Sequence, residues 1–422
     1  MDRFIIHKSS LHGTVEISGS KNACLPIMAA TLLTDEECKI HNIPHLMDII
    51  TMVKILEVLG KQVRYERDTL IIKNRSKLNK VSFAAPYRLV RTMRASFCCL
   101  GPLLARKKKA RVALPGGCVI GLRPVDLHIK GLKALGADLA VEKGYWVGRV
   151  KHLRGSHIYL GGPFGSSVLA TANVLMAATL AEGQTLIEYA ACEPEIEFLG
   201  KFLKKMGADI EGEGTPLIKI KGVKSLGGAE CKVIPDRIEA GTFMAASLAA
   251  KSTIEIKGID TSHLTPVVEV VKMMGGELKM QKGSCRLKSP STLNPVNITT
   301  FPYPGFPTDL QAQFTACLCF AKGTSLITEK VYPDRFMHVA ELNRMGASIQ
   351  RSGPYAIIEG EEMLYGAEVM ASDLRASAAL VIAGLAAEGK TEVTRVYHID
   401  RGYERIEEKL KKLGAKIKRE SQ

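Results

Sequence analysis

Residues 114–128 combine a thiol, a cation and a glycine-rich backbone within one short stretch. Cys118 lies five residues before Arg123, and glycines stand at positions 116, 117 and 121. A nearby guanidinium favours the thiolate over the thiol, and the thiolate is the reactive form. Glycine adopts backbone conformations that other residues resist, so the stretch can form an irregular loop. A cysteine in such a loop is more often structural than catalytic, so these residues alone leave both roles open.

Composition places the chain among ordinary globular proteins. Of its 422 residues, 46% are hydrophobic and 24% are charged, which excludes a largely disordered or collagen-like protein. The length favours two or three domains. The first residues lack a long apolar core, and the longest apolar run, 378–387, is too short to span a bilayer. We therefore expect no signal peptide and no contact with a membrane.

The cysteines and histidines do not follow metal-binding patterns. The ten cysteines include no C-x-x-C pair, and none of the ten histidines is flanked by ligands at metal spacing. These patterns argue against zinc ribbons and thioredoxin-like chemistry, so we expect no metal and no cofactor. Free cysteines of this kind favour a reduced, cytoplasmic location.

The net charge of +15 allows two kinds of partner, nucleic acid or small anionic substrates. The most basic run, residues 106–111, falls between a helical pattern and a strand pattern, which is typical of a solvated turn. Aromatic residues make up only 6% of the chain, and none interleaves with this run as a base-stacking platform requires. We expect small anionic substrates and no nucleic acid.

One pattern recurs six times: an amphipathic helix ends in Leu or Met, a glycine follows, and a short strand begins. By subtraction the glycines are 76, 71, 68, 71 and 68 residues apart, and they are Gly60, Gly136, Gly207, Gly275, Gly346 and Gly414. A glycine at this place is the usual helix stop. Each unit of about seventy residues reads as β-α-β-α-β-β, with one helix rich in small residues. Such helices pack closely, so we expect them inside, surrounded by sheet.

The P-G-G-C and R-P-V-D-L-H runs around Cys118 resemble the signature of the UDP-N-acetylglucosamine 1-carboxyvinyltransferases, a branch of the enolpyruvyl transferases. Further motifs extend the resemblance from Ser18 to Arg405. It implies an α/β fold of two domains, each an inside-out α/β barrel, with three of the six βαβαββ units in each. We predict one domain at 22–233, carrying the Cys loop, and a second made of 1–21 and 234–422.

In the first half, the resemblance implies contacts with both substrates. Lys21 would contact the phosphate of phosphoenolpyruvate, Asn22 the sugar, and Arg94 the nucleotide-sugar. Without the resemblance, a lysine like Lys21 is most often a solvated turn residue, and an arginine on a helix like Arg94 usually lies at the surface. The loop and the next interior helix supply the other candidates. Arg123 would contact phosphate, and the uracil would be contacted by Pro124, Val125, Asp126 and Leu127. The diphosphate would be contacted by Ser166, Ser167 and Val168.

The diphosphate motif departs from the family pattern at two positions. Leu169 replaces the usual glycine, and Gly165 stands where many members have lysine. Backbone N–H groups at a helix start suit a phosphate, so the expectation of a diphosphate site here remains.

In the second half, the resemblance concerns one acid and three arginines. Asp309 begins a predicted helix and could simply cap it, whereas the family uses this acid to take the proton of the sugar 3-hydroxyl. Arg335, Arg375 and Arg401 each follow an acidic residue by one or two positions, so surface salt bridges are one interpretation. The other is convergence on the carboxylate of phosphoenolpyruvate, which guanidinium groups match in a bidentate geometry. Val331 would contact the sugar through its backbone.

The implied reaction transfers the enolpyruvyl group of phosphoenolpyruvate to the 3-hydroxyl of UDP-N-acetylglucosamine and releases phosphate, at the start of peptidoglycan synthesis. Cys118 would act as general acid and Asp309 as base, with Lys21 and Arg401 holding phosphoenolpyruvate. Family members also form an adduct between this cysteine and phosphoenolpyruvate, and fosfomycin inhibits them. Two alternatives are the same fold acting on shikimate 3-phosphate, whose branch lacks both runs, and a nucleic-acid-binding protein without enzymatic activity.

Overall fold

The computed structural model of the chain describes residues 2–75, 82–114 and 125–421. These residues form two compact units. Unit 1 contains the described residues up to Ser18 and from Pro235 onward, and unit 2 contains those from Gly19 to Ile234. Each unit has its own continuous hydrophobic core.

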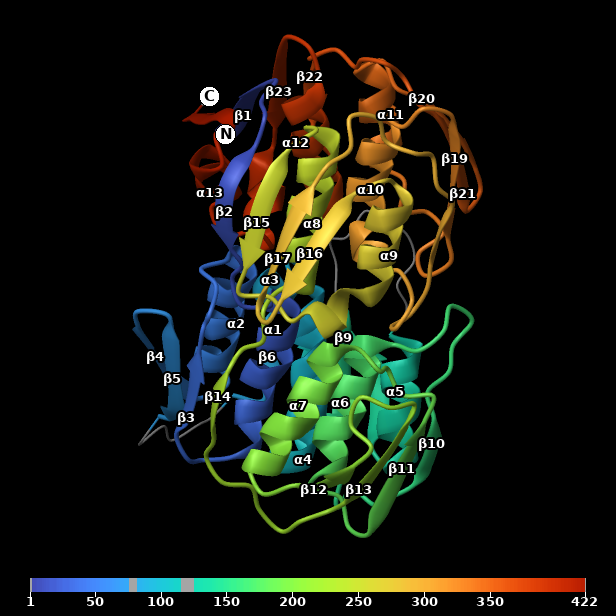
Figure 1. The fold of residues 1–422 in the computed structure, drawn as a ribbon. Helices are drawn as coiled ribbons and strands as arrows, with labels where there is room; N and C mark the ends of the chain where they lie inside the picture. Colours follow the sequence, from blue (N-terminus) through green and yellow to red (C-terminus); the bar gives the residue numbers. More distant parts are fainter. Residues whose placement is uncertain (1, 76–81, 115–124, 422) are drawn as a thin grey trace. The chain divides into compact units, whose positions relative to one another are not determined.

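Unit 1 is built from the first two strands and the second half of the chain (Figure 1). Its elements are β1 (Asp2–His7), β2 (His12–Glu16), α8 (Arg237–Ala249), β15 (Thr253–Lys257), the 3-10 helix η3 (Thr261–Leu264), α9 (Thr265–Met273), β16 (Glu277–Gln281), β17 (Ser284–Lys288), β18 (Ile298–Thr300), η4 (Thr308–Leu310), α10 (Gln311–Leu318), β19 (Thr324–Glu329), α11 (His338–Arg344), β20 (Ser348–Ser352), β21 (Tyr355–Glu359), β22 (Glu368–Met370), α12 (Leu374–Ala386), β23 (Lys390–Thr394), η5 (Val396–Arg401), α13 (Ile406–Lys412) and β24 (Lys416–Ser421).

Unit 2 is continuous in sequence. Its elements are α1 (Lys21–Ala30), η1 (Thr31–Leu33), β3 (Cys38–His41), α2 (Met47–Val58), β4 (Lys61–Glu66), β5 (Thr69–Asn74), β6 (Ala84–Ala85), α3 (Tyr87–Val90), η2 (Arg94–Cys99), α4 (Leu100–Lys107), β7 (Lys109–Ala113), α5 (Asp126–Ala134), β8 (Asp138–Glu142), β9 (Tyr145–Arg149), β10 (His157–Tyr159), α6 (Val168–Ala178), β11 (Gln184–Glu188), α7 (Pro194–Lys205), β12 (Asp209–Glu211), β13 (Leu217–Lys221) and β14 (Glu230–Lys232).

Among the described residues there are six four-stranded sheets, three in each unit. Every sheet has one parallel pair at an edge and two antiparallel pairs beside it, as in the order β10-β11-β13-β12. In three sheets one of the four strands comes from a part of the chain distant in sequence. In these sheets β14 pairs with β3, β2 pairs with β15, and β1 lies between β23 and β24. The predicted six βαβαββ units, three in each unit, are therefore confirmed.

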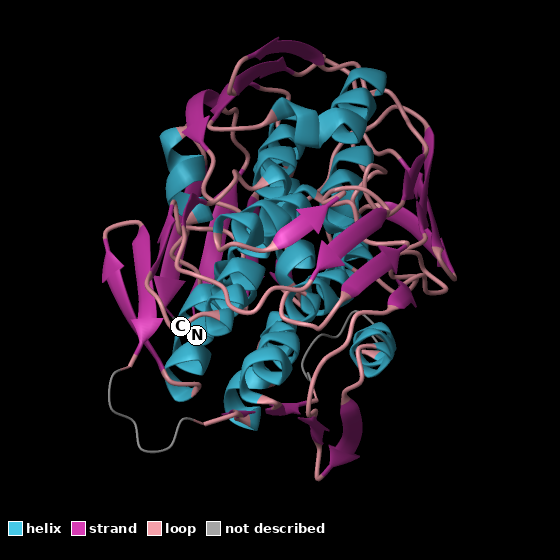
Figure 2. Ribbon diagram, turned by 90° about the horizontal axis from the view of Figure 1, so that it is seen from below, coloured by secondary structure: helices cyan, strands magenta, loops and turns pink. Residues whose placement is uncertain are grey.

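The interior of each unit is helical, which confirms the inside-out arrangement. In unit 1, α8, α10 and α12 pack against one another, and strands lie outside them (Figure 1). Figure 2 shows the same separation by colour, with cyan helices inside and magenta strands around them. All residues from 375 to 385 in α12 are buried, because its many Ala, Ser and Gly residues let neighbouring elements approach closely.

The six predicted helix stops have the geometry that the pattern indicated. All six glycines have positive φ angles, between 93° at Gly136 and 102° at Gly207. A side chain would strain the backbone there, so glycine ends each helix and starts the outer hairpin. The regular spacing of these glycines in the sequence thus reflects a backbone conformation that each helix end requires.

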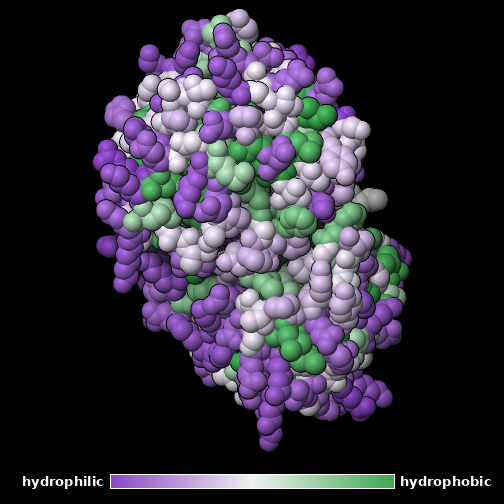
Figure 3. All heavy atoms as spheres, turned by 45° about the vertical axis from the view of Figure 1, so that its right-hand side comes forward, coloured by the Kyte–Doolittle hydropathy of each residue, from purple (hydrophilic) through white to green (hydrophobic). Residues whose placement is uncertain are grey.

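Figure 3 shows the hydropathy of one face of the molecule. The face in Figure 3 is covered largely by hydrophilic residues, with apolar groups scattered among them. Within the described parts of the chain, every helix is too short or too polar to cross a bilayer.

Candidate active site

Asp309 is held between two buried arginines in unit 1. Its Oδ1 accepts a hydrogen bond from Nη1 of Arg335 at 2.7 Å, and its Oδ2 accepts one from Nη2 of Arg375 at 2.8 Å. The side chains of Arg335 and Arg375 are only 8% and 3% exposed, whereas that of Asp309 is 27% exposed. Burial raises the pKa of Asp309, but the two guanidinium charges outweigh it and hold the pKa well below its usual range. Asp309 is therefore a charged, weakly basic carboxylate in this arrangement.

Among the residues it describes, the structure does not show the helix cap or the neighbouring salt bridges that the sequence also allowed here. Pro307 and Leu310 occupy the N-cap positions of η4 and α10, without a side-chain capping bond, so Asp309 is not a helix cap. The acids next to the three arginines have other bonds. Asp334 pairs with Arg351, Asp400 pairs with Arg419, and Asp373 caps α12.

Both arginines retain hydrogen-bonding capacity. Nε of Arg335 and both Nε and Nη1 of Arg375 are buried and have no hydrogen-bond partner in the described part of the chain. Burying such donors without a partner costs free energy, so these nitrogens are available to donate hydrogen bonds to a further anionic or carbonyl oxygen. Guanidinium groups form their strongest hydrogen bonds with anions such as carboxylates.

Three further residues, which sequence reasoning missed, support Asp309 and Arg375. The guanidinium of Arg375 lies 5.3 Å from the ring centroid of Tyr403, within cation–π range. The Tyr403 hydroxyl is 2.8 Å from that of Thr242 and accepts from the amide of Gln313, which also donates to the backbone oxygen of Asp309 at 2.8 Å. The only sequence signal was position, since Gln313 follows Asp309 by one helical turn.

Arg401, the third predicted arginine, ends η5 and is half-buried. Its segment packs on α12, which begins beside Arg375. Burial lowers the pKa of His398, and Arg401 lowers it further, while Asp373 raises it. Both Arg401 and the cap residue of α12 therefore act on His398.

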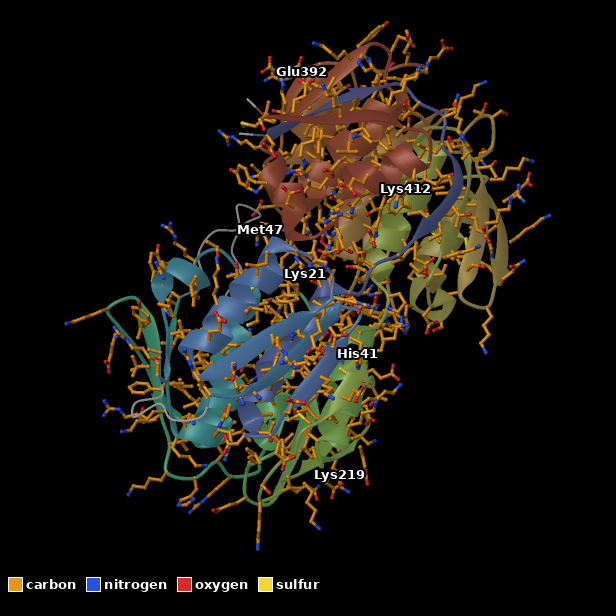
Figure 4. The ribbon with its side chains drawn as sticks, turned by 90° about the vertical axis from the view of Figure 1, so that its left-hand side faces the viewer. Lys21, His41, Met47, Lys219, Glu392 and Lys412 are labelled. Atoms are coloured by element: carbon orange, nitrogen blue, oxygen red, sulfur yellow. The ribbon has the colours of Figure 1, made fainter. Side chains whose placement is uncertain are left out.

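Lys21 begins α1 in unit 2 and lies in a buried ion pair. Its Nζ donates to Oδ2 of Asp48 at 3.0 Å, with side-chain exposures of 10% and 6%. Asp48 is the second residue of α2, next to Met47, and Figure 4 labels both Lys21 and Met47. Ser20 caps α1, and Asn22 is half-buried. Sequence reasoning did not identify Asp48, because nothing in its local pattern distinguishes it from an ordinary acid in a first helical turn.

The other predicted residues of unit 2 lie at the starts of helical segments that pack together. Arg94 begins η2, Asp126 begins α5, and Ser167 caps α6 with Val168 following it. Segments η2 and α5 both pack on α6. Val125, Leu127 and Ser166 flank these starts and are half-buried.

Asn173 and His128 join these starts. The Asn173 side chain accepts from the backbone N–H of Gly101 at 2.6 Å and donates to the carbonyl of Phe97 and to Nδ1 of His128, both at 3.0 Å. Leu127 also approaches the turn before α6, where a Cβ on Gly162 would lie 3.1 Å from Cδ1 of Leu127. Three segments predicted to contact the nucleotide-sugar are therefore fixed to one another.

Cys118, Arg123 and Pro124 lie outside the described residues. Their predicted roles therefore stay predictions.

Two buried histidines should make stability depend on pH. Burial, together with Arg94, lowers the pKa of His128 to about 3, and burial lowers that of His338 to about 4. The unfolded chain binds a proton at each near pH 6.5, whereas the folded chain does not, so the free energy of unfolding should fall as pH drops below about 6.5. Denaturant titrations at pH 7 and pH 5 should differ by about 2 kcal/mol for each histidine.

The matched variants are His128→Gln and His338→Gln, with the exposed His152→Gln as control. Each buried variant should lose its share of the pH dependence, and the control should keep all of it. An unchanged pH dependence in both buried variants would show that these histidines are protonated in the folded protein.

Comparisons with known proteins give consistent results. Residues 5–410 match the family described as EPSP synthase (3-phosphoshikimate 1-carboxyvinyltransferase). The chain is 54% identical over 420 residues to the UDP-N-acetylglucosamine 1-carboxyvinyltransferase of Methylacidiphilum infernorum, covering 99% of both chains. It is 51% identical over 424 residues to UDP-N-acetylglucosamine 1-carboxyvinyltransferase 2 of Carboxydothermus hydrogenoformans, covering 100% of both.

Solved structures share the fold. The crystal structure of the enolpyruvyl transferase NikO from Streptomyces tendae matches with a TM-score of 0.89 at 24% identity, over 99% of this chain and 98% of that one. EPSP synthase from Acinetobacter baumannii matches with a TM-score of 0.77 at 19% identity, over 100% of both chains.

Proposed function

Because this chain belongs to the EPSP synthase family of enolpyruvyl transferases, we propose that it transfers the enolpyruvyl group of phosphoenolpyruvate to the 3-hydroxyl of UDP-N-acetylglucosamine. Phosphate is the second product, and the reaction is the first committed step of peptidoglycan synthesis. The full-length relatives named UDP-N-acetylglucosamine 1-carboxyvinyltransferase support this acceptor over shikimate 3-phosphate. We also propose that the two domains are 22–233 and 1–21 with 234–422. These bounds differ by a few residues from those of the two units, which change at Ser18–Gly19 and at Ile234–Pro235.

The observation that carries the proposal is the pair of buried arginines around Asp309. Arg335 and Arg375 already hold one carboxylate, and three of their nitrogens have no partner within the described residues. The carboxylate of phosphoenolpyruvate has the charge and shape to occupy those nitrogens. Arg401 contributes the third cation, and Lys21 with Arg123 holds the phosphate.

The reaction is an addition followed by an elimination. The Cys118 thiol gives its proton to the methylene carbon, the sugar 3-oxygen bonds to the adjacent carbon, and Asp309 takes the hydroxyl proton. Loss of phosphate together with a proton from the new methyl group restores the double bond. The same cysteine forms the adduct with phosphoenolpyruvate.

The ion pairs of Asp309 link substrate binding to its basicity. While both arginines hold Asp309, its pKa is low and it is a weak base. A phosphoenolpyruvate carboxylate competes for the same guanidinium groups, so its arrival reduces their hold on Asp309 and raises the Asp309 pKa. The base therefore becomes effective when the co-substrate is present.

Most of the proposed contacts with the nucleotide-sugar come from residues of unit 2. The segments that begin at Arg94, Asp126 and Val168 are fixed together by Asn173 and His128, which supports a common binding site for Arg94, 125–127 and 166–168. Asn22, in α1, is the proposed contact of the sugar. The start of α6 suits the diphosphate, because its first backbone N–H groups point out of the helix. Fosfomycin is the expected inhibitor through Cys118, and the cytoplasm is the expected location.

Phosphate release from phosphoenolpyruvate tests the proposal. The purified protein is supplied with UDP-N-acetylglucosamine or, separately, with shikimate 3-phosphate. Release with the first acceptor alone is the expected result. Release with shikimate 3-phosphate alone, or with neither acceptor, contradicts the proposed function.

Arg401→Ala should weaken the use of phosphoenolpyruvate much more than the binding of the nucleotide-sugar. Loss of a hydrogen bond to a charged group predicts a decrease in kcat/KM for phosphoenolpyruvate of about 10- to 100-fold. Calorimetric titration should give an unchanged Kd for UDP-N-acetylglucosamine. Arg344→Ala, which removes an exposed arginine of the same unit, is the control and should change neither value. Equal losses for both substrates would contradict the assignment.

A further inference from the structure

Glu329 is a buried carboxylate to which the proposed reaction gives no role. It ends β19 and is 0% exposed. Its Oε1 accepts from the Thr300 hydroxyl at 2.7 Å and from the backbone N–H groups of Val331 and Tyr332 at 2.8 and 2.9 Å. Its Oε2 accepts from the Thr308 hydroxyl at 2.9 Å. Four donors thus satisfy one carboxylate, which is the condition for burying it.

The Oε1 bonds fix the direction of one backbone carbonyl. The Tyr332 N–H and the Val331 C=O belong to the same peptide group, and in a trans peptide they point in opposite directions. Because this N–H donates to Glu329, the Val331 carbonyl points away from the buried carboxylate. Val331 is the residue expected to contact the sugar through its backbone, and its own N–H is also used by Glu329. The contact therefore goes through an accepting carbonyl.

The Oε2 bond reaches the arginine cluster. A carboxylate oxygen accepts from the Thr308 hydroxyl, so this hydroxyl presents a lone pair to its other neighbour, Nη1 of Arg335, at 3.1 Å. The same Nη1 donates to Asp309. Glu329 therefore determines the direction in which the Thr308 hydroxyl donates its hydrogen, and the oxygen of that hydroxyl holds one edge of the Arg335 guanidinium.

We propose that Glu329 is a positioning residue that orients the Val331 carbonyl for the sugar and, through Thr308, the Arg335 guanidinium for phosphoenolpyruvate. The inference rests on the proposed function for the identity of these two ligands. The structural part of the inference, that one carboxylate orients Arg335 and Val331, is independent of the proposed function.

The two branches can be separated by substitution. Thr308→Val removes only the branch to Arg335, and Thr308→Ser keeps its hydroxyl. Glu329→Gln retains one oxygen for the backbone branch and loses the acceptor that faces Thr308, whereas Glu329→Ala removes both branches. Thr391→Val is the matched control, because Thr391 is a buried threonine of the same unit whose hydroxyl has no partner in the described residues.

Steady-state kinetics should show a split between the substrates. Thr308→Val and Glu329→Gln should raise the KM for phosphoenolpyruvate about tenfold and leave that for UDP-N-acetylglucosamine unchanged, while Thr308→Ser behaves as the wild type. Glu329→Ala should raise both KM values if it folds. Equal changes for both substrates in Thr308→Val, equal losses in its Val and Ser variants, or a Val variant no different from Thr391→Val would overturn the proposal.

Crystal structures of the unliganded Thr308 variants give a readout that does not depend on activity. Arg335 should be displaced in Thr308→Val and unchanged in Thr308→Ser. If the wild type releases no phosphate with UDP-N-acetylglucosamine, the proposed function fails, and the structures still decide whether Thr308 orients Arg335. An unmoved Arg335 in the Val variant overturns the inference even in an active enzyme.

Discussion

Cys118→Asp should retain substantial turnover and become insensitive to fosfomycin, whereas Cys118→Ser should lose about 10²- to 10⁴-fold in rate. The loss is that expected for a missing general acid, because a hydroxyl is too weak an acid to replace the thiol. A carboxylic acid can still donate the proton but is a poor target for the epoxide, which a thiolate attacks. Phosphate release with and without fosfomycin measures both effects.

Cys192→Ser is the control, because Cys192 is a half-buried free thiol of unit 2 to which no role in the reaction is assigned. It should keep both the rate and the inhibition, and mass spectrometry should find the fosfomycin adduct on Cys118. If the Asp variant folds and binds both substrates but is as inactive as the Ser variant, Cys118 is not chiefly a proton donor.

Asp309→Asn should reduce the rate by about 10²- to 10⁴-fold and also destabilise unit 1. The rate falls because an amide cannot accept the hydroxyl proton. Stability falls because the two buried arginines lose their counter-charge, which for a buried pair costs about 3–5 kcal/mol. Phosphoenolpyruvate should then raise the Tm of the variant more than that of the wild type, since its carboxylate replaces the missing charge.

Asp334→Asn is the matched control, because Asp334 pairs with Arg351 at the surface, with 70% of its side chain exposed. It should change Tm by little and leave the rate unchanged. The pH dependence gives a further check. The pKa of Asp309 is lowered in the folded state, so its stabilisation is present above about pH 4 and lost on further acidification, and the Asn variant lacks this part. If phosphoenolpyruvate stabilises both proteins equally, it does not take the place of the Asp309 carboxylate.

The repeats could be predicted from the sequence because each rests on a local requirement. The six glycines end helices through a backbone conformation that few other residues adopt, so their spacing alone gave six units. The same spacing could not show that β1 lies between β23 and β24, because this pairing joins residues almost four hundred positions apart, such as Ile6 and Thr391.

Only part of the candidate site could be predicted from the sequence. Motifs identified Asp309, Arg335 and Arg375, but the residues 26 and 66 positions from Asp309 that hold it are brought there by the fold. Local pattern instead paired each arginine with its preceding acid. No sequence pattern marked Asp48 or Glu329. Each is buried beside hydrogen-bond donors from other segments of the chain, and the residues adjacent in sequence do not show that a carboxylate is buried.

The place of β1 in its sheet has a consequence for synthesis on the ribosome. Unit 2 has all its strands once residue 234 has been made, whereas β1, made before unit 2, pairs only with strands that begin at Lys390 and Lys416. At about 5–20 residues per second, roughly 20 to 80 seconds separate β1 from its partners. During this time Phe4 and Ile6, fully buried in the finished protein, have no core to enter. The nascent chain therefore carries an unpaired apolar strand until β23 and β24 have been made, and an unpaired strand of this kind is prone to aggregation.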